Sequence, residues 1–286
     1  MKKILYLIIL ISLYTISCSY EGGVAPEDDG IAWQQITGKI AYVKGKFLYY
    51  LDSESRSVVS LGATNLTNIK WNKTTEEITG IIIVNDSTYS LEAITLDLKR
   101  SVINNALNTE YYDWMPDGRL VTISNKYKIT IDGDLLLDQT FNPVFGLACS
   151  PDGRKIVIST DNIAENYLLE IDIKSLEQRI IERNLNLFNP NFEQPIYSLD
   201  NDKVFYMTFT VEWDINGFHD RYKIWSTYQI ELEYGKYPSR SNNSHYILFT
   251  KVYHYNGKTI GIYKMNIETG NSVELVRGGY ESVWIY

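Results

Sequence analysis

The stretch CSPDGRKIVI at residues 149–158 decides the fold, because WMPDGRLVTI at residues 114–123 repeats it one unit earlier. In both copies Pro-Asp-Gly stands between a short strand-like stretch and an alternating apolar run. Proline presets φ at the first corner of a turn, Asp bonds to its own backbone, and Gly takes a positive φ. Each copy therefore predicts a β-hairpin, and repetition at a fixed spacing predicts a fold of stacked, similar units.

Weaker copies of the same pattern surround polar turns at residues 72–77, 200–202 and 242–244, each followed by an apolar run. Residues 36–286 comprise 251 positions, so six units would have about 42 residues each, which is typical of four-stranded propeller blades. Five or seven units would need about 50 or about 36 residues each, which fits the observed spacing less well. We therefore predict six blades.

The two ends of this region are expected to meet in one sheet. Residues 281–286 (ESVWIY) form a strand with nothing after it, and residues 38–43 (GKIAYV) are its natural continuation. An open ring would leave sheet edges and apolar faces exposed. Residues 31–33 (IAW) could compete for the innermost place, but we expect Trp33 to pack nearby instead. The predicted fold is all-β: a six-bladed β-propeller of four-stranded antiparallel blades, closed by the C-terminal strand completing the first blade.

Three features resemble the propeller of the TolB family: the Trp-x-Pro-Asp-Gly-Arg signature at Trp114, the opening KIAYV at residues 39–43, and Trp284 in the closing strand. The resemblance covers residues 36–286 and implies the propeller fold. It implies no particular activity, because this fold carries many unrelated functions. TolB proteins have an additional N-terminal α/β domain, for which this chain has no room, so we do not expect the partners of TolB here.

Residues 1–17 combine a basic start with an apolar segment shorter than the roughly 20 residues that span a membrane, which is typical of a signal peptide. Cys18 follows directly and resembles the cysteine of a bacterial lipobox, although Thr15 stands where Leu is usual. We expect Cys18 to carry acyl chains that tether the protein to a membrane without inserting it. Cleavage by an ordinary signal peptidase is the alternative.

Composition limits the remaining choices. Residues 18–35 contain glycines, a proline and acidic residues and predict a flexible tether, while residues 36–286 predict one domain. Without Lys2 and Lys3, 25 Lys and Arg stand against 35 Asp and Glu, a net charge of −10, so nucleic acid is not an expected partner. Cys149 would be the only other cysteine, which excludes an internal disulfide and favours a small buried hydrophobe.

The sequence has no Gly-x-Ser-x-Gly elbow, His-Glu-x-x-His pair, phosphate loop or Gly-x-Gly-x-x-Gly motif. His219 and His254 could share a face, but two histidines without a third ligand do not make a zinc site. Asp214 could serve calcium, yet its surroundings lack the spacing of a calcium loop. We therefore predict no catalytic residue, metal or cofactor.

The predicted binding face is the one opposite the Pro-Asp-Gly turns. Residues 212–220 (EWDINGFHD) are predicted to form its richest loop, with aromatic side chains exposed for contact. The predicted site residues are Asp161, Asn162, Trp213, Asp214, Phe218, His219, His254 and Tyr255.

These features together predict a membrane-tethered, non-catalytic binding or scaffold propeller of the bacterial cell envelope. We expect it at the outer membrane, on the periplasmic or the surface side, with a protein or a glycan as its partner. A glycan lyase or hydrolase with a site at the channel mouth is the alternative, and it would need convergent carboxylates or a His-rich metal site. An assembly or secretion component is a third possibility.

Overall fold

The computed structural model describes residues 30–85, 88–107, 109–123, 127–141, 143–161, 165–184, 192–214, 217–227, 230–241, 243, 245–253 and 258–286. The predicted signal peptide, Cys18 and most of the predicted tether lie outside these residues. In the described part of the chain, no helix has both the length and the apolar character needed to cross a membrane.

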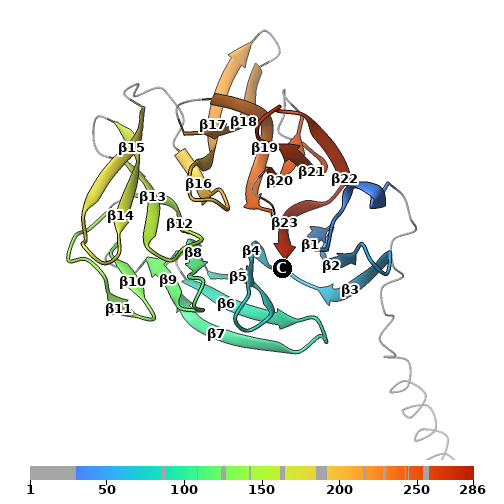
Figure 1. Cartoon of the computed structure of the whole chain (residues 1–286), viewed down its shortest axis with the longest axis horizontal. Coiled ribbons are helices and arrows are strands. Elements are labelled where there is room, and N and C mark those ends of the chain that lie inside the picture. Colours follow the sequence, from blue (N-terminus) through green and yellow to red (C-terminus); the bar gives the residue numbers. More distant parts are fainter. Residues whose placement is uncertain are drawn as a thin grey trace, which may run out of the picture.

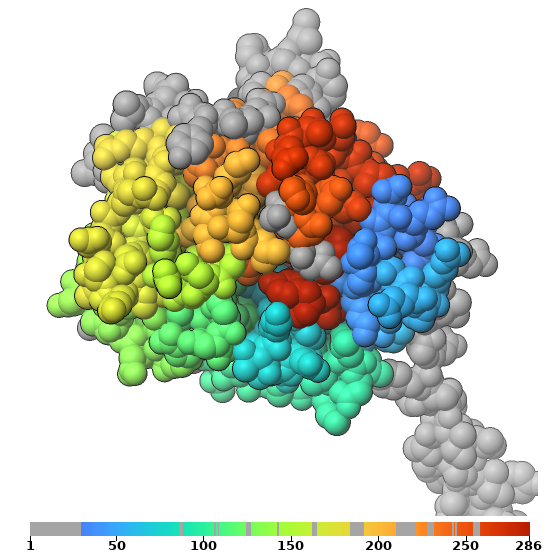
Figure 2. Space-filling view, viewed as in Figure 1, coloured from blue at the N-terminus to red at the C-terminus, as the bar shows by residue number. Residues whose placement is uncertain are grey.

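In the part of the chain that the structure describes, all strand pairs are antiparallel, and the strands form five sheets arranged around a common centre (Figure 1, Figure 2). The first sheet has the order β23-β1-β2-β3 and consists of β1 (Lys39–Lys44), β2 (Phe47–Asp52), β3 (Ser57–Ala63) and β23 (Tyr280–Ile285). The second sheet consists of β4 (Thr67–Asn72), β5 (Glu77–Asn85), β6 (Thr88–Thr95) and β7 (Arg100–Leu107). The third sheet consists of β8 (Tyr112–Trp114), β9 (Leu120–Ile123), β10 (Ile129–Ile131) and β11 (Asp134–Leu135).

The remaining two sheets differ in size. The fourth sheet consists of β12 (Val144–Cys149), β13 (Lys155–Asp161), β14 (Asn166–Asp172) and β15 (Gln178–Asn184). The fifth sheet has seven strands: β16 (Phe192–Tyr197), β17 (Val204–Asp214), β18 (Gly217–Ser226), β19 (Ile230–Arg240), β20 (Tyr246–Val252), β21 (Thr259–Asn266) and β22 (Ser272–Arg277). The described residues therefore form an all-β structure whose helical content is the short 3₁₀ turn η1 (Trp33–Gln35).

Strand β19 belongs to two groups of strands. Its first half pairs with β18, up to Tyr234 opposite Lys223, and its second half pairs with β20 from Gly235 opposite Lys251. Strand β19 is thus the neighbour of β18 along its first half and the neighbour of β20 along its second half. This shared strand is why seven strands form a single hydrogen-bonded sheet.

The last strand lies beside the first. Ile40 pairs with Trp284 and Lys39 with Ile285, so β23 is the edge strand of the first sheet next to β1. Trp33 does not take that place and packs against the buried cluster that contains Trp284. Figure 1 shows the C-terminal end near the centre of the ring.

The repeated turns have the geometry that their residues require. Gly153 has a φ of 69°, and its N–H donates to the carbonyl of Ser150, while Asp152 Oδ1 accepts from the N–H of Arg154. In the turn that follows Ser198, Asn201 takes the glycine position with a φ of 64°. The prediction of Pro-Asp-Gly hairpins and of a degenerate copy at residues 200–202 is confirmed.

Six clusters of buried apolar side chains occur in the described part of the chain, and each joins two neighbouring groups of strands. One lies inside the seven-stranded sheet, where Phe205 of β17 packs near Phe249 of β20. Another joins β20 to the first sheet through Leu248 and Trp284. Burying one side chain of this size contributes about 1.5–3 kcal/mol, so packing between sheets is a major source of stability.

The prediction of a loop at residues 212–220 is wrong. Strand β17 continues to Asp214 and β18 begins at Gly217, so the backbone of residues 212–214 pairs with that of residues 217–219 in a long hairpin. Alternating apolar and polar residues continue through the segment and extend the strands, although Asp, Asn and Gly within it favour a turn. Residues 215 and 216 lie outside the described residues.

Candidate functional site at the centre of the ring

The predicted site residues that the structure describes lie at the end of β13 and in the β17–β18 hairpin. Trp213 lies opposite Phe218 in the β17–β18 hairpin, and His219 lies opposite Glu212. Asp214 ends β17, and this hairpin projects from the rim in Figure 1. Asp161 ends β13 and is half-buried, and burial raises the pKa of its carboxyl. Asn162, His254 and Tyr255 lie outside the described residues.

A cavity of about 100 Å³ lies at the centre instead, lined by β4, β8, β12, β16, β19 and β23 with the residues next to them. Each of these strands has one equivalent residue, in the strand or just before it. It stands three positions before the residue that corresponds to Trp71, Trp114 or Trp284 in the repeat. These equivalent residues, all of which line the cavity, are Asn68, Tyr111, Gly146, Gln194, Tyr237 and Glu281. We call them the inner ring.

The backbone at the inner ring is unusual. Asn68, Gln194, Tyr237 and Glu281 have φ angles of 51°, 46°, 52° and 43°, and each lies at a shift in strand register. Such β-bulges redirect a side chain and are frequent beside functional sites, and a left-handed residue other than Gly costs free energy. Four of the strands that line the cavity therefore hold a strained residue at the same level.

Gly146 completes this level for a steric reason. A Cβ atom on Gly146 would lie 2.5 Å from Cδ of Pro195 and 2.8 Å from the backbone N of Gln194. Strands β12 and β16 approach closely at this point, so any side chain would force them apart. Glycine is the residue that allows the two strands to meet at the cavity.

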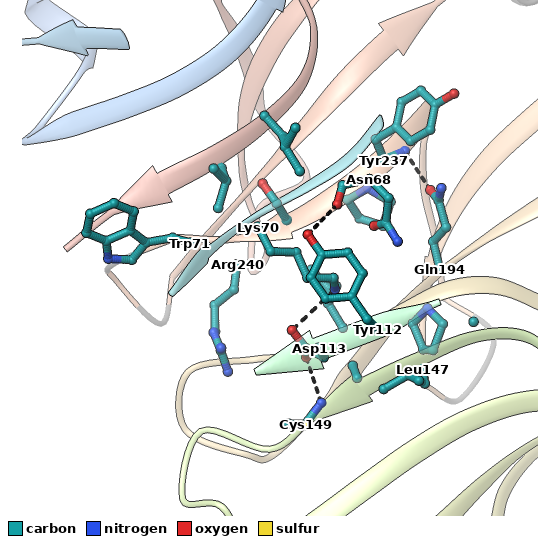
Figure 3. Close-up of a pocket in the computed structure, with 18 of the residues that line it drawn as sticks. Asn68, Lys70, Trp71, Tyr112, Asp113, Leu147, Cys149, Gln194, Tyr237 and Arg240 are labelled. Carbon is teal, nitrogen blue, oxygen red and sulfur yellow. Dashed lines mark hydrogen bonds and ion pairs between the residues drawn. The ribbon is translucent and has the colours of Figure 1, made fainter. Parts of the chain in front are cut away.

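Hydrogen bonds connect neighbouring inner strands. The Nδ2 of Asn68 donates to the carbonyl of Glu110 at 2.7 Å, and the hydroxyl of Tyr112 donates to the carbonyl of Asn68 at 3.0 Å. The N–H of Tyr237 donates to Oε1 of Gln194 at 3.2 Å (Figure 3). These bonds hold the cavity wall in one geometry, as preorganised recognition requires.

Two carboxyl groups in or next to the inner ring have strongly raised pKa values. Burial raises the pKa of Glu281, which is 3% exposed, to about 7, although backbone N–H groups of Ile69 and Asn68 act in the opposite direction. Burial, followed by the charge of Glu110, raises the pKa of Glu193 to about 7. Both carboxyl groups therefore change charge near neutral pH.

Charged side chains line the cavity further along the inner strands. Lys70 Nζ lies 3.3 Å from Oδ1 of Asp113, and both side chains are largely buried. Oδ2 of Asp113 accepts from the N–H of Cys149 at 2.8 Å (Figure 3). Cys149 is 2% exposed, and burial raises the pKa of its thiol well above the usual value, as the prediction of a small buried hydrophobe requires. Arg240 occupies the place that Trp71, Trp114 and Trp284 take in other units.

The sequence contained one usable signal for these cavity residues. The inner ring stands three positions before the Trp position of each unit. The prediction of the binding site relied on the loops between strands and therefore missed these residues. Among the described residues, no group of three or more His, Cys, Asp or Glu is arranged to hold a metal ion. The site offers amides, phenols, carboxyls and two cations, which suit polar recognition.

Comparisons with known proteins place the fold. No family model matches the chain, and no curated protein matches it. TolB from Acinetobacter baumannii aligns with a TM-score of 0.63 and 14% identity, over 87% of this chain and 66% of that one. A chain of a nidogen–laminin complex aligns with a TM-score of 0.59 and 14% identity, over 86% of this chain and 98% of that one.

An enzyme-like structure also matches. A putative 6-phosphogluconolactonase from Bacteroides uniformis aligns with a TM-score of 0.52 and 12% identity, over 85% of this chain and 98% of that one. This chain spans just under two thirds of the length of the TolB chain. At these identities the likeness concerns fold alone, and it shows that the chain is a β-propeller.

Proposed function

We propose that this chain is a non-catalytic binding or scaffold propeller of the bacterial cell envelope, tethered to a membrane, and that it recognises a protein or glycan partner at the mouth of the central cavity. The inner ring is the observation that carries the proposal. It presents amide and phenol groups at one level, on strands that hydrogen bonds and bulges hold rigid. Rigid polar groups around an opening recognise a partner at low entropic cost.

The proposal includes a ring of six blades that the C-terminal strand completes. Six apolar clusters among the described residues, each between neighbouring groups of strands, support this count. The seven-stranded sheet would then be two blades that share β19. The pairing of β23 with β1 supports closure, because it places both ends of the propeller in one blade.

The predicted rim residues join the proposed binding face. In antiparallel sheets, the start of an inner strand lies on the same side as the hairpin between the second and third strands. The hairpins that carry Asp161, Trp213 and Phe218 therefore lie on the side of the inner ring. Asn162, Asp214, His219, His254 and Tyr255 complete this proposed rim, where aromatic and polar side chains would contact a partner.

The membrane tether rests on the residues around Cys18. Replacing Cys18 with Ala should release the chain from membranes into the soluble fraction, because the acylated thiol would be lost. The measurement is detergent extraction and fractionation of cells that produce the wild type or Cys18→Ala. Retention of the variant in the membrane fraction would show that another element anchors the chain.

Binding is tested with the full chain, purified in detergent and immobilised. Solubilised envelope proteins and envelope glycans are passed over the wild type, the Trp213→Ala/Phe218→Ala double variant, and Gln194→Ala. We expect capture of one partner to fall about tenfold or more in both variants, as for contact residues at the centre of an interface. Arg154→Ala, in an exposed turn on the opposite face, is the matched control. Equal capture by folded variants would remove both positions from the binding face.

A glycan lyase or hydrolase is the second candidate, and Glu193 is the observation that favours it. A carboxyl group with a pKa of about 7, next to a second carboxyl at Glu110, suits proton transfer at neutral pH. Release of sugar fragments from envelope glycans by the wild type, abolished in Glu193→Gln, would establish the enzyme. Capture of a glycan without cleavage would favour the binding module.

A further inference from the structure

Arg240 is a charged residue in an apolar place. It lies near the end of β19, lines the central cavity, and occupies the position of a Trp in three other units. Its Nε and Nη1 atoms are buried, and neither has a hydrogen-bond partner among the described residues. Burying part of a cation without an acceptor is costly, so such a group is normally matched by an anion.

The carboxylates that line this cavity are engaged elsewhere. The two oxygens of Asp113 contact Nζ of Lys70 and the N–H of Cys149, respectively. The carboxyl of Glu281 accepts from the N–H of Ile69. In Figure 3 dashed lines join Asp113 to both of its partners, and none reaches Arg240. Neither cavity carboxylate therefore serves as the counter-ion of this guanidinium.

Two cations, Lys70 and Arg240, line the cavity near Cys149. Both Lys70 and Arg240 counteract the rise in pKa that burial imposes on the thiol of Cys149, which places both cations close to it. Asp113 and Asp117 act on the same thiol in the opposite direction, so the charges around it are balanced in number. Because Lys70 is paired with Asp113, Arg240 is the cation here whose buried donors lack an acceptor among the described residues.

The size of the cavity limits the anion. Its volume of about 100 Å³ is below the roughly 150 Å³ of an engineered cavity that admits benzene. A slender planar group fits better than a ring. Guanidinium N–H donors match the two oxygens of a carboxylate in geometry and charge.

We propose that Arg240 forms a carboxylate-binding site in the central cavity. The carboxylate is either a small free acid or the side chain of an Asp or Glu residue in a bound peptide. This inference does not rest on the proposed function, because it concerns the binding of a carboxylate to the chain alone.

The test uses the full chain in detergent and follows its melting temperature as acetate replaces chloride at constant ionic strength. Acetate should raise the melting temperature of the wild type, because a ligand that binds the folded state stabilises it. Arg240→Met should not respond, and its affinity for acetate should fall about tenfold or more with the loss of a charge-assisted contact. Arg154→Met, which removes an exposed arginine, is the matched control and should respond like the wild type.

Two results would overturn the site: a wild type that acetate does not stabilise beyond chloride, or a folded Arg240→Met variant that responds as the wild type does. If circular dichroism shows that Arg240→Met does not fold, Arg240→Lys keeps the charge and should bind acetate more weakly than the wild type. An unchanged affinity in Arg240→Lys would also count against the site, because a single ammonium cannot reproduce the planar fork.

A second arm distinguishes the two sources of the carboxylate. The capped peptide Gly-Glu-Gly is compared with acetate, and Gly-Gln-Gly serves as the uncharged control. Tighter binding of Gly-Glu-Gly than of acetate assigns the site to a peptide side chain, whereas equal affinity assigns it to a free acid. Binding of Gly-Gln-Gly as tight as that of Gly-Glu-Gly would contradict carboxylate recognition.

Discussion

The carboxylate of Glu281 on β23 accepts a hydrogen bond from the backbone N–H of Ile69 on β4, with 3.4 Å between N and Oε2. The two residues are 212 positions apart in the sequence, and the bond joins the first sheet to the second. Glu281 itself is 3% exposed and has a left-handed backbone. A buried carboxyl thus lies at a contact between sheets that depends on long-range folding.

Replacing Glu281 with Gln should stabilise the protein at high pH. The pKa of Glu281 is about 7 in the folded state against 4.5 for a free side chain, so the folded state holds the proton more tightly. Its contribution to stability is complete below about pH 4.5 and is lost as the pH rises through about 7, a loss of about 3 kcal/mol. Glu281→Gln stays neutral, and its free energy of unfolding should fall less over this window.

Urea unfolding at several pH values between 4 and 8 measures the effect, with Glu54→Gln as the control, because Glu54 lies exposed in the turn after β2. Glu193, whose pKa is also raised to about 7, should leave a residual slope in the variant. If the free energy of unfolding of Glu281→Gln depended on pH as that of the wild type does, the carboxyl of Glu281 would ionise in the folded state without a cost in stability.

Gly146→Ala should destabilise the fold by about 1–3 kcal/mol, the usual cost of overpacking. The added Cβ would lie 2.5 Å from Cδ of Pro195, so β12 and β16 would have to separate. Pro195→Ala in the same chain removes the clashing atom and should recover part of the loss, although the backbone N of Gln194 stays close. Additive effects of the two substitutions in chemical denaturation would argue against this contact.

The turn residues Gly153 and Asn201 should respond differently to substitution. Both have a positive φ, but Asn tolerates this conformation better than other non-glycine residues. Gly153→Ala should lose about 1 kcal/mol, and Asn201→Gly should change stability by a few tenths. Thermal denaturation measures both, and a neutral Gly153→Ala would show that the turn can relax to a negative φ.

Cys149 should be unreactive in the folded protein. Its side chain is buried, and burial raises the pKa of the thiol, so the thiolate that attacks disulfide reagents is scarce. In a Cys18→Ala background, a chromogenic disulfide reagent should label Cys149 only after denaturant unfolds the chain. Rapid labelling under native conditions would show that β12, an edge strand of the fourth sheet, opens.

The sequence predicted the parts of this fold that repeat. Pro-Asp-Gly turns, the alternation of apolar residues and the spacing of the units specify hairpins and blades, because each is encoded within a few neighbouring residues. The pairing of β23 with β1 was also expected, from the Trp-bearing strand at the end of the chain and the opening strand that begins at Lys39.

The cavity could not be predicted in the same way. A left-handed backbone could not be predicted from the residue types of Gln194, Tyr237 and Glu281. The bulges that contain them arise where neighbouring strands pack around the centre. The hairpin at Trp213 was expected to be a loop, because its Asp, Asn and Gly residues outweighed the strand pattern on both sides. Local sequence describes turns well, whereas bulges depend on contacts between distant strands.

The dual role of β19 has a mechanical consequence. Within β19, Tyr234 pairs with β18 and the next residue, Gly235, pairs with β20. A displacement of one group of strands would therefore be transmitted to the other through this single strand. We expect the seven strands of the fifth sheet to unfold locally as one cooperative unit, so that their amide protons exchange with solvent together.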